Sequence, residues 1–84
     1  MTRLWPEGVL IDVVEDGGGK PDHLIWQGRN HTVSLITRRW RVRSDWWRDP
    51  VWRDYFKIIT KSGLLLIIFH DLNSDKWFLQ RLFD

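Results

Sequence analysis

The chain has 84 residues, a formal net charge of +2 and no cysteine. A chain of this length is expected to form one domain, residues 1–84, and the missing cysteines exclude disulfides and thiolate metal sites. The N-terminal residues contain no apolar run like that of a signal peptide, and the longest apolar run, residues 64–69, is too short to span a bilayer. We therefore expect a soluble, cytoplasmic protein that does not associate with membranes.

Three strands are predicted in the first half of the chain. Residues 9–14, 23–27 and 31–43 are rich in β-branched and aromatic side chains or alternate between apolar and polar ones. Three glycines and a proline predict a flexible loop over residues 16–22, and a Gly-Arg-Asn turn at residues 28–30 separates the second strand from the third. No helix can run through the glycine-rich loop.

The last part of the third strand has the clearest alternation in the sequence. Trp40 and Val42 share one face, because side chains alternate across a strand. Three arginines lie on the opposite face: Arg39, Arg41 and Arg43. We expect Trp40 and Val42 to pack inward and the three arginines to line the outer face. The apolar residues before position 36 have the opposite parity from Trp40, which predicts a bulge near residues 37–38.

A turn-rich connector is predicted after this strand, from Ser44 to Trp52. Ser44 or Asp45 could cap a short helical turn near residues 45–49, and Pro50 limits its extension. Three further strands are then predicted: residues 54–60, 64–70 and 76–83. The middle one is apolar on both faces, so we expect it to be central and covered on both sides. Six short antiparallel strands indicate an all-β domain, either a strongly curved sheet or a small open barrel.

The sequence offers little chemistry for an enzyme. No Gly-x-Ser-x-Gly motif exposes a nucleophile, and the glycines at 17–19 lack the Gly-Lys-Ser/Thr ending of a phosphate-binding loop. His23 and His31 could lie near one another across the turn at residues 28–30, but no third ligand accompanies them, so we expect no metal and no cofactor. We therefore predict a protein that is not an enzyme and has no catalytic residues.

The strongest signal is a segment rich in arginine and tryptophan. Four of the seven tryptophans lie between residues 40 and 52, and residues 38–57 contain seven basic and three acidic side chains. Arg and Trp are enriched at the hot spots of protein interfaces, and the same side chains bind phosphates and stack on unpaired bases. Eight residues form the predicted contact surface: Arg39, Arg41, Arg43, Trp46, Trp47, Arg48, Trp52 and Arg53.

The alternative for these side chains is a structural role. Arginines can stack over buried tryptophans, and the carboxylates of Asp45, Asp49 and Asp54 stand among arginines, where ion pairing within the chain is their simplest role. Three tryptophans follow strand parity and are predicted to belong to the framework: Trp26, Trp40 and Trp77. A further set near the two ends of the chain could form a homodimer patch: Trp5, Leu82 and Phe83.

Parts of the sequence resemble a known family. Residues 39–42 (Arg-Trp-Arg-Val), 45–48 (Asp-Trp-Trp-Arg) and 76–84, with a Trp-aromatic ending, resemble the C-terminal tail of ImuB, the Y-family-polymerase-like protein of the bacterial mutasome. Small stand-alone proteins of unknown function share this tail, and the likeness extends over residues 38–84. It implies a part in damage-induced translesion synthesis, where ImuB-type proteins contact the sliding clamp and partner proteins. No catalytic residue carries over, because the polymerase palm lies outside the matching segment.

These observations together predict a non-enzymatic interaction module that binds a protein partner, in a bacterial DNA-damage-tolerance system. Two alternatives stay open: direct binding of single-stranded nucleic acid by the same face, and a self-associating structural domain. The modest net charge of +2 favours the protein partner over nucleic acid.

Overall fold

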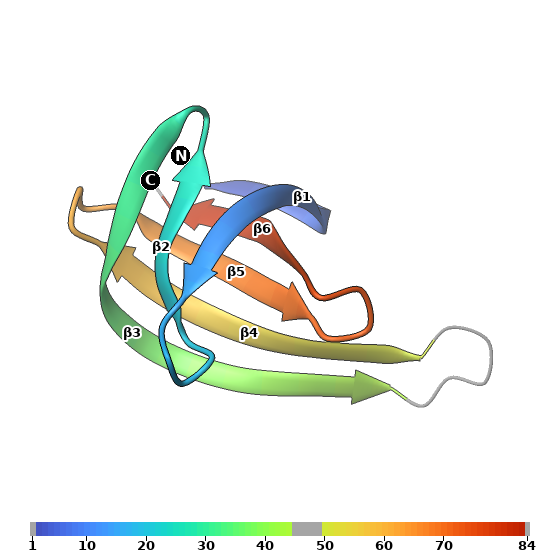
Figure 1. The fold of residues 1–84 in the computed structure, drawn as a ribbon. Helices are drawn as coiled ribbons and strands as arrows, with labels where there is room; N and C mark the ends of the chain where they lie inside the picture. Colours follow the sequence, from blue (N-terminus) through green and yellow to red (C-terminus); the bar gives the residue numbers. More distant parts are fainter. Residues whose placement is uncertain (1, 45–49, 84) are drawn as a thin grey trace.

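The computed structural model describes residues 2–44 and 50–83, and its regular elements are six antiparallel β-strands (Figure 1). The strands are β1 (Arg3–Glu15), β2 (Pro21–Trp26), β3 (Arg29–Ser44), β4 (Val51–Thr60), β5 (Leu65–Asp71) and β6 (Lys76–Phe83). The predicted all-β class with six antiparallel strands is confirmed. The predicted helical turn near residues 45–49 lies outside the described residues. Within the described part of the chain there is no helix of the length and apolarity needed to cross a membrane.

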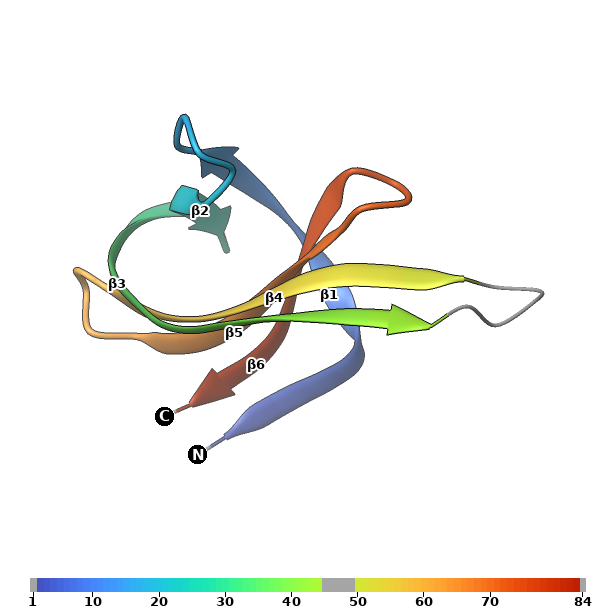
Figure 2. The ribbon, with the colours of Figure 1, turned by 90° about the horizontal axis from the view of Figure 1, so that it is seen from below.

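The six strands close into a barrel in the order of the sequence. Each strand pairs with the next, and β1 closes the ring because its first part pairs with β6 and its last part pairs with β2. Figure 2 shows the strongly curved β3 bending around one side of this ring. The sequence predicted either a strongly curved sheet or a small open barrel, and the structure is a barrel that is closed. Closure also gives hydrogen-bonding partners to strand edges that an open sheet would expose.

Two turns in the first half differ in length from the prediction. The glycine-rich turn spans only residues 16–20, because Pro21 already belongs to β2. Oδ1 of Asp16 accepts hydrogen bonds from the backbone N–H groups of Lys20 (3.0 Å) and Gly18 (2.8 Å), and these two bonds lower the pKa of Asp16. The next turn is shorter than the predicted one, since β3 already begins at Arg29.

The predicted bulge in β3 is confirmed. The register with β4 shifts between Val33 and Leu35 and again between Ile36 and Arg38. Before this point β3 pairs with β2, and after it β3 pairs with β4 alone. A bulge increases the local bend of a strand. At this irregular segment, β3 therefore bends away from β2 and continues along β4.

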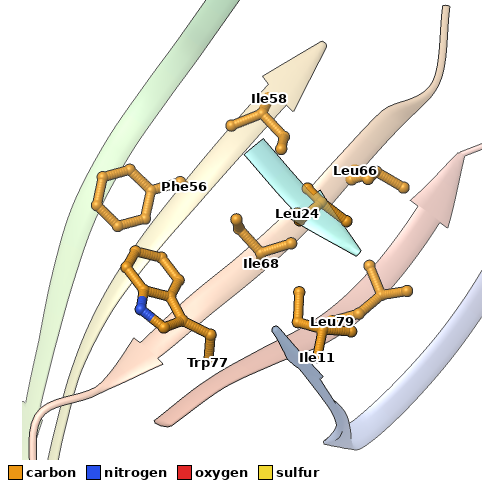
Figure 3. Close-up of a cluster of buried hydrophobic side chains, with 8 residues drawn as sticks. All are labelled: Ile11, Leu24, Phe56, Ile58, Leu66, Ile68, Trp77 and Leu79. Atoms are coloured by element: carbon orange, nitrogen blue, oxygen red, sulfur yellow. The ribbon is translucent and has the colours of Figure 1, made fainter. Parts of the chain in front are cut away.

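The barrel interior is filled by one apolar cluster (Figure 3). Its buried members come from every strand except β3: Ile11, Leu24, Phe56, Ile58, Leu66, Ile68, Trp77 and Leu79. Burying a side chain of this kind contributes about 1.5–3 kcal/mol to folding relative to leaving it exposed. No residue of β5 is exposed, which confirms that this strand is covered on both faces.

A second set of aromatic rings packs on the outside of the barrel. Trp40, Tyr55, Phe69 and Phe78 form a row across β3, β4, β5 and β6, with successive ring centroids 5.3, 5.1 and 5.0 Å apart. Phe69 is fully buried there, although it faces away from the interior cluster. The backbone of β1 covers it at Gly8, which has φ of +82°, and a Cβ at Gly8 would lie 2.9 Å from the Phe69 ring.

The predicted orientation of β3 is wrong. Directly opposite residues on paired strands share a face. Trp40 lies opposite Tyr55 and stacks on it, so it is on the outer face, whereas Arg39 lies opposite the core residue Phe56. The arginines therefore share the face that continues from the barrel interior. The reason is that β4 fills the interior with Phe56 and its neighbours of the same parity, and the β3–β4 register then fixes which side chains of β3 join them.

Candidate functional site

The last part of β3 and the first part of β4 pair with each other over residues 38–44 and 51–57, which we call the arm. β5 also pairs with β4 from Arg53 onward, and the end of the arm extends beyond the ring (Figures 1 and 2). The β5–β6 turn supports β4 near its start. The backbone N–H of Leu72 donates to the carbonyl oxygen of Trp52 at 2.9 Å, and Nδ2 of Asn73 donates to that of Pro50 at 2.8 Å. The arm is thus held on its β4 side by the rest of the molecule.

One face of the arm concentrates charge. We call it the inner face, and it consists of Arg39, Arg41 and Arg43 from β3 with Trp52 and Asp54 from β4. Asp54 is buried, and Arg41 binds it with both ends of its guanidinium: Nε donates to Oδ1 at 2.6 Å and Nη2 donates to Oδ2 at 3.0 Å. Nη2 of Arg39 also donates to Oδ2, at 3.4 Å. The predicted ion-pairing role of Asp54 is confirmed, while Asp45 and Asp49 lie outside the described residues.

These contacts set the electrostatics of the inner face. The hydrogen bonds from Arg41 hold the pKa of Asp54 below its ordinary value, with a smaller contribution from Arg39, although burial acts in the opposite direction. The same pairing raises the pKa of Arg41. Asp54 therefore stays ionised and fixes the orientation of two guanidinium groups. Counted over the described residues of the inner face, three arginines and one carboxylate give a net charge of +2.

An exposed indole ring lies among these charges. Trp52 is 40% exposed, and the guanidinium carbons of Arg41 and Arg43 lie 5.8 and 5.5 Å from its ring centroid. Arg39 lies 5.2 Å from the centroid of Phe56, which links the inner face to the barrel core. Arginines held over aromatic rings lose less freedom when they bind an acidic group, and bidentate pairing with carboxylates is their preferred geometry. The inner face can therefore recognise carboxylates beside an apolar anchor.

The structure brings together half of the predicted contact residues. Four of the eight lie on the inner face: Arg39, Arg41, Arg43 and Trp52. Trp46, Trp47 and Arg48 lie outside the described residues. Trp52 belongs to β4 and not to the connector in which it was predicted, because β4 begins directly after Pro50.

Arg53 is on the other face of the arm. Its guanidinium carbon lies 4.6 Å from the Phe69 centroid, and its Nη1 donates to the hydroxyl of Tyr55 at 3.4 Å. Its Nε is buried and has no hydrogen-bond partner among the residues that the structure describes. Arg53 thus covers the outer aromatic row, as the structural alternative for the arginines expects, and its contact role stays a prediction.

Sequence reasoning missed a second basic group, which we call the outer basic row: Arg38, Lys57 and Arg81. Arg38 lies opposite Lys57, and both Lys57 and Arg81 lie opposite Ile67 of β5. The cations lie against aromatic rings, with Arg38 4.9 Å from Trp40 and Lys57 and Arg81 5.2 and 5.5 Å from Phe83. Across the described residues, none of the three forms an ion pair. The three residues are brought together by the register of the strands from β3 to β6, since Arg81 is distant from Arg38 and Lys57 in the sequence.

The histidines do not converge. His31 lies opposite the core residue Leu24, and its Nδ1 is 3.1 Å from the hydroxyl of Ser62. His23 belongs to the adjacent pair and therefore points to the other face, where it contacts Asp22 at 3.0 Å. No three His, Asp or Glu side chains in the described part of the chain are arranged to hold a metal ion.

The predicted homodimer patch does not form one surface. Trp5 and Leu82 pack against the interior cluster, and the ring centroid of Trp5 lies 6.3 Å from that of Trp26. Phe83 lies on the outside, beneath Lys57 and Arg81. Trp5 and Leu82 therefore lie on the other side of the barrel wall from Phe83, and self-association stays a prediction.

The fold and this site together define a small six-stranded barrel that carries a basic, aromatic arm. Over residues 9–84 the chain matches the family described as a domain of unknown function, DUF6504, and it belongs to that family. The matched region contains the whole arm and all strands except the first part of β1. No curated protein and no solved structure matches the chain significantly.

Proposed function

We propose that this protein is a non-enzymatic interaction module that binds an acidic protein partner through the inner face of the arm. The observation that carries the proposal is the grouping of three arginines and a partly exposed tryptophan on one face of the arm, where Asp54 is the carboxylate among the described residues. Trp and Arg dominate binding energy at protein interfaces when they lie together near the centre of the contact.

Each residue of the inner face has a distinct part in this proposal. Trp52 is the apolar anchor, because its ring is the large aromatic surface on this face that solvent reaches. Arg43 and Arg39 supply charge for carboxylates of the partner. Asp54 orients Arg41, so the guanidinium is already ordered before the partner arrives, and preorganisation of this kind favours affinity.

The test uses the double variant Arg43→Ala/Trp52→Ala as bait beside the wild-type protein. Proteins from the source organism that are retained by wild type and lost by the variant are identified, produced separately and titrated against both forms. We expect at least a hundredfold loss of affinity, which corresponds to about 2.7 kcal/mol. The matched control, Lys57→Ala/Arg81→Ala, removes two cations from the outer basic row and should bind as wild type. A partner that binds both double variants with equal affinity would rule out the inner face as the binding site.

A second candidate function is the binding of single-stranded nucleic acid along the outer basic row. The observation that favours it is the alignment of three cations without a carboxylate partner in the described structure. Affinity for an oligonucleotide should then fall steeply with salt, with a slope of about −0.7 per neutralised phosphate in a double-logarithmic plot. The variant Lys57→Ala/Arg81→Ala should reduce that slope by about 1.4. An oligonucleotide that fails to bind at low salt removes this candidate.

The pathway is a separate part of the proposal. The likeness of residues 38–84 to the tail of ImuB supports a place for the partner among the proteins of damage-induced translesion synthesis. Deletion of the gene in the source organism should then lower the frequency of mutations induced by ultraviolet light, and the wild-type gene should restore it. If the Arg43→Ala/Trp52→Ala variant also restores the mutation frequency, the protein acts in this pathway without using the inner face of the arm.

A further inference from the structure

The arm has one strand edge without a neighbour. β3 pairs with β2 only over residues 29–32 and with β4 over residues 33–44, and it approaches no other strand. Along residues 38–44, the edge of β3 that faces away from β4 therefore meets no strand among the described residues (Figures 1 and 2). In both views this edge lies along the border of the molecule.

We propose that the partner adds an extended, acidic strand to this free edge of β3; the inference rests on the arm being the partner-binding site. Backbone N–H and C=O groups alternate between the two edges of a strand, so about half of those in residues 38–44 point toward the vacant side. An exposed edge of this kind is a template for pairing with another chain. A protein segment satisfies these groups, whereas a nucleic acid has no backbone that continues a β-ladder.

The charge of this edge strand favours an acidic segment over a second copy of the chain. Residues 38–44 contain four arginines and no acidic residue. A second copy pairing with the same edge would place arginines opposite arginines, and like charges directly opposite one another destabilise a strand pair. An acidic segment gains from the same arrangement. The arm is thus protected against self-pairing while it remains open to a segment of opposite charge.

The two faces of the arm predict the pattern of that segment. Residues directly opposite on paired strands share a face, so alternate residues of the added strand lie beside Arg39, Arg41 and Arg43. The residues between them lie beside Trp40 and Val42, and Val42 is 38% exposed. We therefore infer a segment in which acidic and apolar residues alternate, with the acidic ones on the inner face.

Four synthetic peptides test this inference. The first is about eight residues long and alternates glutamate with valine, which matches the length of an ordinary strand. The second has the same composition with the glutamates and valines in separate blocks. The third and fourth are the alternating peptide with N-methyl groups on one or the other set of alternate amides, which leaves every side chain in place and removes the donors of one strand edge.

Calorimetric titration at low salt should rank these peptides. We expect the alternating peptide to bind at least tenfold more tightly than the block peptide. One N-methylated peptide should lose at least tenfold in affinity and the other should bind as the unmodified one, because only one edge of the added strand pairs with β3. In the complex, amide hydrogen exchange should slow at least tenfold at alternate residues of 38–44.

The outcomes separate strand addition from the proposed function. Equal affinities of the two N-methylated peptides, or unchanged exchange in residues 38–44, would overturn strand addition. The proposed function would then still stand if Arg43→Ala/Trp52→Ala weakens a native partner. A variant that binds both peptide and partner as wild type would overturn both. Slowed exchange of these amides by an oligonucleotide, or by self-association of the protein alone, would identify a different occupant and overturn the inference.

Discussion

Asp54 is the residue that organises the inner face. It is buried, and its carboxylate accepts hydrogen bonds from Arg41 and Arg39. Its pKa is lower in the folded protein than the ordinary value of 3.8, so the unfolded chain binds more protons as pH falls below about 4. The stability that Asp54 contributes is therefore present above this value and is lost as pH falls through the lowered pKa.

The variant Asp54→Asn tests this linkage. It should reduce the free energy of unfolding by about 2 kcal/mol near neutral pH, because charged hydrogen bonds to two arginines are lost. The difference from wild type should shrink as pH falls below about 4, where the native carboxylate is protonated as well. Urea denaturation of both proteins over a range of acidic pH values measures it. A difference that stays constant across the range would show that the lowered pKa of Asp54 does not stabilise the fold.

Gly8 is required by the packing of β1 against the outer aromatic row. A Cβ there would lie 2.8 Å from Cβ of Phe78 and 2.9 Å from Cε2 of Phe69, and φ is +82°. Gly8→Ala should therefore cost about 3 kcal/mol, from backbone strain and overlap together. Gly28→Ala is the matched control, because Gly28 has φ of +73° and nothing within 4 Å of the added Cβ. The control should cost about 1 kcal/mol, and equal urea midpoints for the two variants would contradict the overlap.

Arg53 stabilises the molecule through its aliphatic stem and its position over Phe69. Arg53→Ala would expose this ring, so we expect a loss of about 1–2 kcal/mol. Arg53→Met keeps most of the cover and relieves the buried Nε, and it should cost less than about 0.5 kcal/mol. Thermal unfolding of the two variants compares them. If Arg53→Met destabilises the protein as much as Arg53→Ala, the charge of Arg53 contributes more to stability than its cover of Phe69.

At the scale of the element, the two faces of the arm differ in what they stabilise. Trp40 is stacked on Tyr55 with ring planes 8° apart, whereas Trp52 is exposed and lies near the end of the arm. Trp40→Ala should therefore cost about 2 kcal/mol of unfolding free energy, and Trp52→Ala less than about 1 kcal/mol. Partner binding should show the reverse order. Equal destabilisation by both substitutions would place Trp52 in the packed structure.

Within a single strand, the alternation of side chains predicts some structural features and not others. Alternation in β3 correctly separated Trp40 from the arginines, and the change of parity correctly located the bulge between Ile36 and Arg38. Alternation alone does not say which face points into the barrel. We predicted that the larger apolar side chain would point inward, but the interior beside Arg39 is already filled by Phe56.

At the scale of the whole molecule, closure divides the strands into two classes. β5 pairs with a neighbour along both edges, whereas the arm part of β3 pairs along one. Backbone amides paired within a covered strand open only with the whole fold, whereas exposed edge amides exchange freely. Native-state hydrogen exchange should therefore be slowest in β5 and fastest at alternate residues of 38–44. Uniform protection along both strands would show that the edge is covered in solution.

The sequence by itself determined the number of strands, the limits of β6, the cover of β5 on both faces and the bulge in β3. These follow from local signals, namely turn residues, alternation and an apolar run, which act between neighbours in the chain. Only the tertiary structure decided barrel closure, the inward face of β3, the cover of Phe69 by Gly8 and the alignment of Arg38, Lys57 and Arg81. Each of these depends on register between strands that are distant in sequence, and register is fixed by how side chains fill the shared interior.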